Sequence, residues 1–196
     1  MQLDSVRPVH VADVLVEGEP WPGHLHVVEH PDGLVLVDTG MIDSTPELDE
    51  EWHPTTYPER IPREGVVAVV NTHLHFDHCG GNRLFAGSGV PIYVQRAERE
   101  AAREPDYTVP EWVEFAGARY VELDGEAEIV PGVRVLPTPG HSPGHQSVLV
   151  DTEDGLVVVA GDVAYRWEDF DAAAGPILAL RPRRVWLAHE TEPRDT

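Results

Sequence analysis

Basic residues are scarce in this chain, and lysine is absent altogether. The 196 residues include 14 arginines against 35 acidic residues, which gives a formal net charge of −21. A surface this acidic repels nucleic acid and anionic membranes, so we expect neither as a partner. We interpret most of the excess negative charge as an acidic surface that favours solubility.

Cysteine and long apolar runs are nearly missing as well. Cys79 is the only cysteine, so the chain can form no internal disulfide and gives no support to an oxidising compartment. No apolar run approaches the roughly 18 residues that span a bilayer. The N-terminus also lacks the basic and apolar regions of a signal peptide. We therefore predict a cytoplasmic protein.

Short, β-branched apolar segments dominate the remaining sequence and predict an α/β fold rich in strands. The continuous runs at 34–38, 66–71 and 156–160 are typical of strands buried on both faces. We expect two sheets packed face to face and covered by helices, within one domain of residues 1–196. The predicted strands cover 9–16, 24–30, 34–38, 66–71, 91–94, 119–122, 127–130, 133–137, 147–151, 156–160 and 184–188, and the predicted helices cover 79–86, 95–104 and 169–180.

Three segments are expected to be loops on the surface. Residues 43–64 contain four prolines and many charges, which argues against a long regular helix. Residues 104–117 mix aromatic side chains with acids, a pattern that fits a pocket wall and an ordinary cover equally well. Residues 17–24 form a third, brief loop.

Metal-binding side chains are concentrated in residues 73–78, which read HLHFDH. Imidazole and carboxylate groups are ligands for zinc, iron, manganese or cobalt. His73 and His75 are one residue apart, so on extended backbone they point to the same side and can chelate one ion. Asp77 and His78 are adjacent and diverge, which suits a second ion. Without a bound ion, four such groups after a buried strand would lose their hydration without gaining compensating interactions.

Three further candidate ligands each follow another apolar run. They are His141 in TPGHSPGH, Asp162 in AGDVAY and His189 in WLAHE. Groups placed at the ends of four strands can converge on one rim of a sheet sandwich. Seven ligands are too many for one tetrahedral ion and suit two ions that share a bridging group. The pattern therefore predicts a two-metal hydrolytic centre.

Other metal-capable residues are interpreted differently. A lone histidine is usually solvated or hydrogen-bonded, and Cys79 beside a complete set of nitrogen and oxygen ligands is expected to be a small buried residue. His145, four residues after His141, is expected to orient a ligand or to brace a loop rather than to bind the metal. Asp38, in DTG, is expected to bind loop amides or to orient a ligand histidine. The histidines that we do not expect to be ligands are His10, His24, His26, His30 and His53.

The string THLHFDHCGGN resembles the H-x-H-x-D-H motif of the metallo-β-lactamase-fold hydrolases. The segments LVLVDTGM, TPGHSPGH, GD and AHE match the remaining blocks of that superfamily in the same order. The resemblance covers nearly the whole chain and implies a four-layer αβ/βα sandwich with a dinuclear site on one edge. The residues that it implies as ligands are His73, His75 and His141 for one ion, Asp77, His78 and His189 for the other, and Asp162 as the bridge.

Within the superfamily, HLHFDH and LVDTGM resemble the wording of the N-acyl homoserine lactonases, and Tyr165 follows Asp162 by three positions as in that branch. The resemblance implies that Tyr165 contacts the substrate carbonyl, although Tyr165 and Phe76 also fit as packing residues. It implies a hydroxide shared by two divalent ions, Zn²⁺ first and Fe, Mn or Co as alternatives, that opens a lactone or related carboxylic ester. Asp77 is expected to pass a proton to the leaving alkoxide.

Other functions share these motifs. A thioester hydrolase of the glyoxalase-II type would use the same centre on another small-molecule ester. An iron-dependent redox protein, such as a persulfide dioxygenase or a flavodiiron protein, would use the fold for another class of chemistry. The complete ligand set at Asp77, His78 and His189 argues against the mononuclear dioxygenase, and the lack of a flavodoxin-like partner domain against the flavodiiron protein. A non-catalytic scaffold is disfavoured because no ligand position is substituted.

Overall fold

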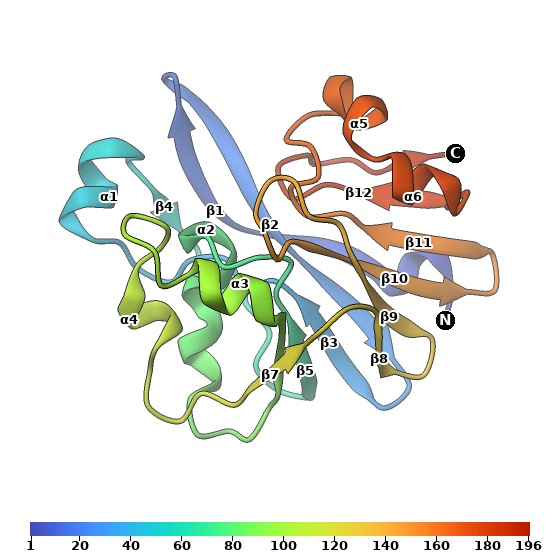
Figure 1. Cartoon of the computed structure of the whole chain (residues 1–196), viewed down its shortest axis with the longest axis horizontal. Helices are drawn as coiled ribbons and strands as arrows, with labels where there is room; N and C mark the ends of the chain where they lie inside the picture. The colour runs from blue at the N-terminus through green and yellow to red at the C-terminus, as the bar shows by residue number, and fades with distance from the viewer.

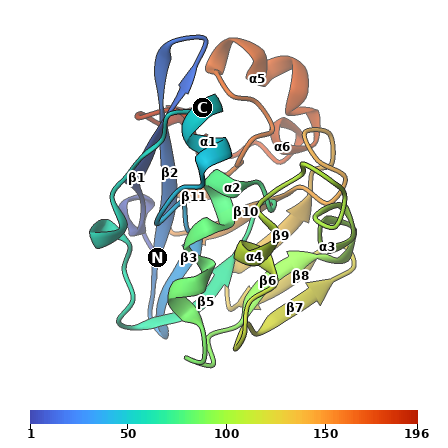
Figure 2. The same cartoon turned by 90° about the vertical axis from the view of Figure 1, so that its left-hand side faces the viewer.

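Two β-sheets pack face to face in the structure, a computed structural model that describes residues 1–196 (Figures 1 and 2). The seven strands of the first sheet are, in spatial order, β4 (Thr55–Thr56), β1 (Val6–Val16), β2 (Glu19–His30), β3 (Gly33–Val37), β5 (Val66–Val70), β6 (Ile92–Gln95) and β7 (Tyr120–Leu123). The six strands of the second are β13 (Arg194–Asp195), β12 (Arg184–Trp186), β11 (Gly155–Val159), β10 (Gln146–Thr152), β9 (Val133–Pro137) and β8 (Ala127–Val130).

Each sheet combines antiparallel and parallel pairs. In the first sheet β1, β2 and β3 pair antiparallel, whereas β3, β5, β6 and β7 run parallel. In the second sheet β8 to β11 pair antiparallel, and β11 and β12 are parallel. Parallel strands end at the same edge of a sheet, so the loops that follow β3 and β5 lie together, as do those that follow β11 and β12.

Short helices cover the outer faces of the two sheets. In Figure 1 the helices α1 to α4 lie beside the first sheet, and α5 and α6 lie beside the second. None of the helices combines the length and the apolar character that a membrane crossing requires. The helices are α1 (Pro46–Glu51), α2 (Phe76–Cys79), α3 (Arg96–Ala101), α4 (Pro110–Val113), α5 (Trp167–Ala173) and α6 (Gly175–Ala179), with 3-10 turns at Leu3–Ser5, Pro58–Arg60 and Gly80–Phe85.

Valine fills most of the space between the sheets, where its branched side chain suits a pleated surface. Val37 of β3 and Val148 of β10 belong to one cluster that joins the facing sheets. Separate clusters lie on the outer faces, one around Phe85 on the first sheet and one around Phe170 on the second. This layering confirms the predicted αβ/βα sandwich of the metallo-β-lactamase fold.

The helices differ from the prediction in length and number. The helix predicted over 169–180 is two helices, because Pro176 has no N–H and its ring would clash with a carbonyl one turn earlier. The helix predicted over 79–86 is mostly 3-10, and α3 is shorter than 95–104. The short helices α1 and α4 and the two-residue strands β4 and β13 were not predicted.

The loop predicted at 17–24 is instead the tip of a long β-hairpin. Glu17 and Gly18 both have positive φ, 55° and 85°, as a tight two-residue turn between twisted strands requires. Pro20 and Pro22 lie on β2 and pair with β1 only, beyond the point where β3 begins to pair. Proline is tolerated on such an unpaired edge because its missing N–H removes no ladder bond.

Candidate metal centre and substrate cavity

The structure brings all seven predicted ligands together at the ends of four strands. Residues 73–78 follow β5, His141 follows β9, Asp162 follows β11, and His189 follows β12. The ligand atoms form three overlapping groups in which all atoms lie within 4.8 Å of one another. The first group is His73, His75 and His141, and the second group is Asp77, His78 and His189. The third group, His73, His78 and Asp162, overlaps with both.

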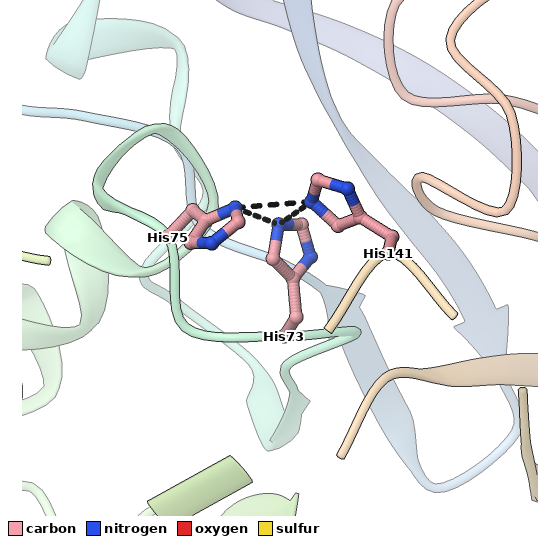
Figure 3. A group of neighbouring side chains, drawn as sticks. All are labelled: His73, His75 and His141. Atoms are coloured by element: carbon pink, nitrogen blue, oxygen red, sulfur yellow. Dashed lines mark hydrogen bonds between the residues drawn. The ribbon is translucent and has the colours of Figure 1, made fainter. Parts of the chain in front are cut away.

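Three ring nitrogens converge in the first group (Figure 3). The Nε2 atom of His73 lies 3.0 Å from Nδ1 of His75 and 3.1 Å from Nε2 of His141, and the last two atoms are 3.0 Å apart. A point just above such a triangle lies about 2 Å from all three nitrogens, which matches a Zn–N bond of about 2.0–2.1 Å. The triangle therefore has the size that one metal ion needs.

These three rings are held in the neutral form that binds metals. Burial, together with the charge of His78, keeps the pKa of His73 well below its usual value. Burial also lowers the pKa values of His75 and His141, against the opposing effect of nearby carboxylates. The first group thus offers three uncharged nitrogen donors, whereas the second group also contains a carboxylate oxygen donor, from Asp77.

Asp162 lies between the two groups. One of its oxygens, Oδ2, is 3.4 Å from Nε2 of His78, 3.4 Å from Nε2 of His189 and 3.7 Å from Nε2 of His141. Asp77 faces the same two histidines of the second group, at 3.6 Å from each Nε2 atom. The position of Asp162, close to histidines of both the first and the second group, is the one that a carboxylate shared between two ions would have.

The second group attracts positive charge. Burial alone would lower the pKa of His78, but the negative charges of Asp162, Asp77 and Asp38 together raise it well above its usual value. The buried Nε2 of His78 and Oδ1 of Asp162 have no hydrogen-bond partner in the protein. A buried polar atom without a partner lowers the stability of the folded state. A bound cation would give both atoms a partner, because each can donate a lone pair to it. The donor set and its orphaned atoms thus fit divalent metal ions.

Asp38 orients His78, one of the predicted ligand histidines, and binds a loop amide. Its carboxylate accepts a hydrogen bond from the backbone N–H of Thr72 at 2.7 Å and from Nδ1–H of His78 at 2.9 Å. Its own backbone has a positive φ of 63°, a conformation that aspartate tolerates better than most residues. His189 is oriented in the same way, because its Nδ1–H donates to the carbonyl of Pro22 at 3.0 Å.

His145 and Cys79 lie beside the site without joining its groups. Nε2 of His145 accepts a hydrogen bond from the backbone N–H of Asp162 at 3.1 Å, so this fully buried ring braces the Asp162 turn. Burial lowers the pKa of His145 to about 3, which keeps Nε2 free to accept. Cys79 is fully buried, and burial raises the pKa of its thiol to about 12. Both placements agree with the predictions.

Three of the remaining histidines, His10, His24 and His30, have hydrogen-bond partners outside the ligand groups. His24 lies 3.0 Å from the carbonyl of Ala188, and His10 lies 2.8 Å from Asp13. The five histidines that were not expected to be ligands all lie outside the three ligand groups. They are His10, His24, His26, His30 and His53.

A cavity of about 760 Å³ opens onto the ligand groups. All three predicted loops contribute to its wall: the β1–β2 hairpin, the segment that holds α1, and residues 106–111. The segment 104–117 also acts as a cover, because Trp112 and Val113 are buried in the core. Besides Phe76, the apolar wall residues are Val14, Val16, Trp21, Leu48, Trp52, Val109 and Pro110.

Sequence patterns had not identified most of these wall residues. Trp21, Leu48 and Trp52 occur in proline- and acid-rich segments, where the two tryptophans are the only sign of a binding role. Phe76 packs near Trp52 with ring centroids 5.7 Å apart. Phe76 is therefore a wall residue of the cavity.

Tyr165 stands at the junction of the cavity and the first ligand group. It lines the cavity, 43% of it is exposed, and its hydroxyl lies 3.2 Å from Nδ1 of His141. Its ring also meets Trp21 edge-on, at 5.6 Å between centroids. Its hydroxyl is accessible to a molecule in the cavity.

Comparison with known proteins agrees with this geometry. The model of the Metallo-beta-lactamase superfamily matches residues 18–190. An N-acyl homoserine lactonase of Bacillus cereus is 38% identical over 170 residues, which cover 76% of this chain and 67% of that protein. The solved structure of a quorum-quenching N-acyl homoserine lactone lactonase superposes with a TM-score of 0.78 at 27% identity, covering 94% of this chain and 91% of that one.

A second solved structure bears directly on the site. It is an N-acyl homoserine lactone hydrolase with the product N-hexanoyl-L-homoserine bound at its catalytic metal centre. It superposes with a TM-score of 0.71 at 32% identity, and the match covers 90% of this chain and 83% of that one. On its fold, its ligand groups and these matches, this chain belongs to the metallo-β-lactamase superfamily.

Proposed function

We propose that this protein hydrolyses the lactone ring of N-acyl homoserine lactones with the help of two divalent metal ions. The observation that carries this proposal is the apolar cavity that opens directly onto the ligand groups, with Tyr165 at the junction. An acyl chain would lie along the apolar wall while the ester of the lactone reaches the metal centre. The lactonase relatives at 36–38% identity support the same reading.

The proposed ligands follow from the groups that the structure brings together. Two divalent ions bound there would polarise the ester carbonyl and lower the pKa of a shared water from about 15.7 towards about 7. We propose Zn²⁺, because the histidine-rich first group offers the borderline nitrogen donors that zinc prefers. The first ion is assigned to His73, His75 and His141, the second to Asp77, His78 and His189, and Asp162 to both.

Two side chains on the cavity wall are assigned to the reaction itself. The hydroxyl of Tyr165 would donate a hydrogen bond to the carbonyl oxygen as negative charge develops there. Burial, reinforced by the charges of Asp162 and Asp77, raises the pKa of Tyr165, so the hydroxyl keeps the proton that it must donate. The carboxylate of Asp77, which also lines the cavity, would carry a proton to the leaving alkoxide.

The charge of the cavity argues against the thioester alternative. Glu47, Glu51, Asp106 and Glu111 line its outer part, and no arginine is among the lining residues. A glutathione thioester carries two carboxylates, which would face these four acids without a cation to pair with. A neutral acyl chain meets no such repulsion.

No observation in the structure favours the iron-dependent redox function. We further propose that residues 1–196 act as one hydrolase domain. A small-molecule lactone is the expected partner, and the cytoplasmic location stays a prediction.

A substrate panel tests the proposal. The purified protein, loaded with Zn²⁺, is assayed on N-hexanoyl and N-decanoyl homoserine lactones, a simple unsubstituted lactone and S-lactoylglutathione. We expect the acylated lactones to be opened with the highest kcat/KM and the thioester to be turned over least. Turnover of the thioester alone would contradict the lactonase assignment, and oxygen consumption with one iron per chain would contradict the hydrolase class.

A further inference from the structure

One buried carboxylate lies beside the ligand groups without belonging to them. Glu98 of α3 is completely buried, yet it pairs with no arginine. Carboxylates are almost never fully buried unless their oxygens are satisfied by hydrogen bonds. The partners of Glu98 therefore indicate why it is there.

Four donors from three separate segments converge on this carboxylate. Its Oε1 accepts hydrogen bonds from the backbone N–H of Leu74 at 2.8 Å and from the hydroxyl of Tyr107. Its Oε2 accepts from the hydroxyl of Ser142 at 2.7 Å and from the backbone N–H of Gly144 at 3.1 Å. Each oxygen thus takes one backbone N–H and one hydroxyl.

Two of these segments carry the first ligand group. Leu74 stands between His73 and His75 in the first ligand loop (residues 71–75). Ser142 follows His141 in the second ligand loop (residues 138–145). The two loops belong to different sheets, since the first follows β5 and the second follows β9. The carboxylate of Glu98 ties both loops to one helix.

The third segment is the wall of the cavity. Tyr107 lines the cavity, and its ring lies 4.7 Å from the ring of His75 between centroids. Burial and the hydrogen bond to Glu98 raise the pKa of the Tyr107 hydroxyl, so this group remains a donor. The same carboxylate therefore fixes one side of the wall against a ligand histidine.

The contact between α3 and the second ligand loop is also close at the backbone. A Cβ atom added to Gly144 would lie 2.1 Å from the backbone nitrogen of Glu98. The loop can reach the carboxylate only because residue 144 has no side chain. The close approach and the four hydrogen bonds together describe a built connection.

We propose that Glu98 is a positioning residue, which holds the first and second ligand loops at the spacing that one metal ion requires. This inference rests on the proposed ligand assignment, and it does not depend on which ester is the substrate. Glutamine cannot replace Glu98 in this role. Its single carbonyl oxygen can satisfy one of the two backbone N–H groups, and its NH₂ group would face the other.

Zinc titration of the metal-free protein tests the inference. The affinity of each Zn²⁺ equivalent is measured by competition with a chromophoric chelator in the wild type and in Glu98→Gln. We expect one equivalent to bind about tenfold to hundredfold more weakly, in the range seen when a partner that orients a ligand is removed. The other equivalent should keep its wild-type affinity. Glu100→Gln is the matched control, because it removes the same charge from an exposed position of the same helix.

A double-mutant cycle separates positioning from general stability. The effect of Glu98→Gln on zinc affinity should persist in an Asp77→Asn background and vanish in a His141→Ala background. Unchanged zinc affinities, or an equal loss at both sites, would overturn the proposal even if the melting temperature of the metal-free protein falls. If Glu98→Gln does not fold, Ser142→Ala removes a single bond to Oε2 and should still weaken one equivalent selectively. If the zinc affinities change as expected but the wild type does not hydrolyse lactones, the positioning role of Glu98 is supported and only the proposed function is refuted.

Discussion

The Nδ1 atom of His141 lies 3.2 Å from the hydroxyl oxygen of Tyr165. The Nε2 atom of the same ring faces His73 and His75, and with Nε2 bound to the proposed metal ion the neutral ring would carry its hydrogen at Nδ1 and donate it to the tyrosine oxygen. The O–H of Tyr165 is then left to donate into the cavity. A proposed metal ligand thus orients the group that we assign to the substrate carbonyl.

Replacement of this hydroxyl should therefore affect the rate and leave the metal in place. For Tyr165→Phe we predict two bound metal ions per chain and a loss of about tenfold to a thousandfold in kcat, the range of a single oxyanion donor. Metal content by mass spectrometry and kcat on N-hexanoyl homoserine lactone are the two measurements. An unchanged kcat would show that Tyr165 only forms part of the wall.

Loss of the shared carboxylate should remove metal and activity together. Asp162→Ala takes away the carboxylate that faces both the first and the second ligand group, so we expect fewer than two ions per chain. We expect kcat/KM to fall by more than about 100-fold, beyond the effect of losing an orienting partner. Asp124→Ala, at an exposed position, is the control and should match the wild type. Full metal content in Asp162→Ala would refute the bridging role.

The acids at the outer part of the cavity should select against anionic substrates. We predict that the triple variant Glu47→Gln, Glu51→Gln and Glu111→Gln hydrolyses a lactone with a carboxylate at the end of its acyl chain about threefold to tenfold faster in kcat/KM. Each charge contributes a few tenths of a kcal/mol at these exposed distances, and the gain should shrink as salt is added. A neutral acyl-chain lactone should be hydrolysed as by the wild type.

A second triple variant controls for the change in net charge. Glu64, Glu104 and Glu126 are exposed and lie outside the cavity lining, so their replacement by glutamine alters the total charge equally. The same gain in both triple variants would mean that the overall charge of the protein, and not the cavity, sets the preference.

The clustering of the seven candidate ligands could be predicted from the sequence because its signals are local. Each candidate ligand directly follows a short apolar run, and β-branched runs predict strands whose ends meet at one edge. Asp162 follows a buried run, as Asp38 does, so its place marks it only as a candidate, and the resemblance implies its bridging role. The two sheets and their buried strands could be predicted on the same grounds.

The cavity wall and the buried carboxylate depend on contacts between distant segments, which local patterns do not contain. Glu98 lies in QRAEREAARE, which reads as a charged surface helix, and its burial arises from three segments that fold over it. Trp21 lies between two prolines, which disfavour a central strand, yet it belongs to β2, where this part of the strand pairs on one side only. By contrast, the break between α5 and α6 was predictable from Pro176, and the single helix over 169–180 was a wrong prediction.

Acid should destabilise the protein through a histidine in its core. Burial lowers the pKa of His26 to about 3, against 6.5 in the unfolded chain. Below pH 6.5 the unfolded state therefore binds a proton at His26 that the folded state does not bind. The free energy of unfolding falls as the pH decreases towards 3. In the chelator-treated protein, we predict that His26→Gln reduces the pH slope of the unfolding free energy by up to about 1.4 kcal/mol per pH unit.

Denaturant unfolding of both proteins at several values between pH 6.5 and 4.5 gives this slope. His53 is exposed, and its backbone has a positive φ of 42° that asparagine tolerates, so His53→Asn is a suitable control. Equal slopes in the wild type and His26→Gln would show that the core histidine does not resist protonation.

The dependence of lactone hydrolysis on bound metal tests the two-metal centre most directly. The metal-free protein is titrated with Zn²⁺ while ring opening of N-hexanoyl homoserine lactone is followed by proton release. We predict no measurable turnover without metal and a rate that reaches its plateau at two equivalents per chain. A plateau at one equivalent, or full activity in the chelated protein, would contradict the two-metal account.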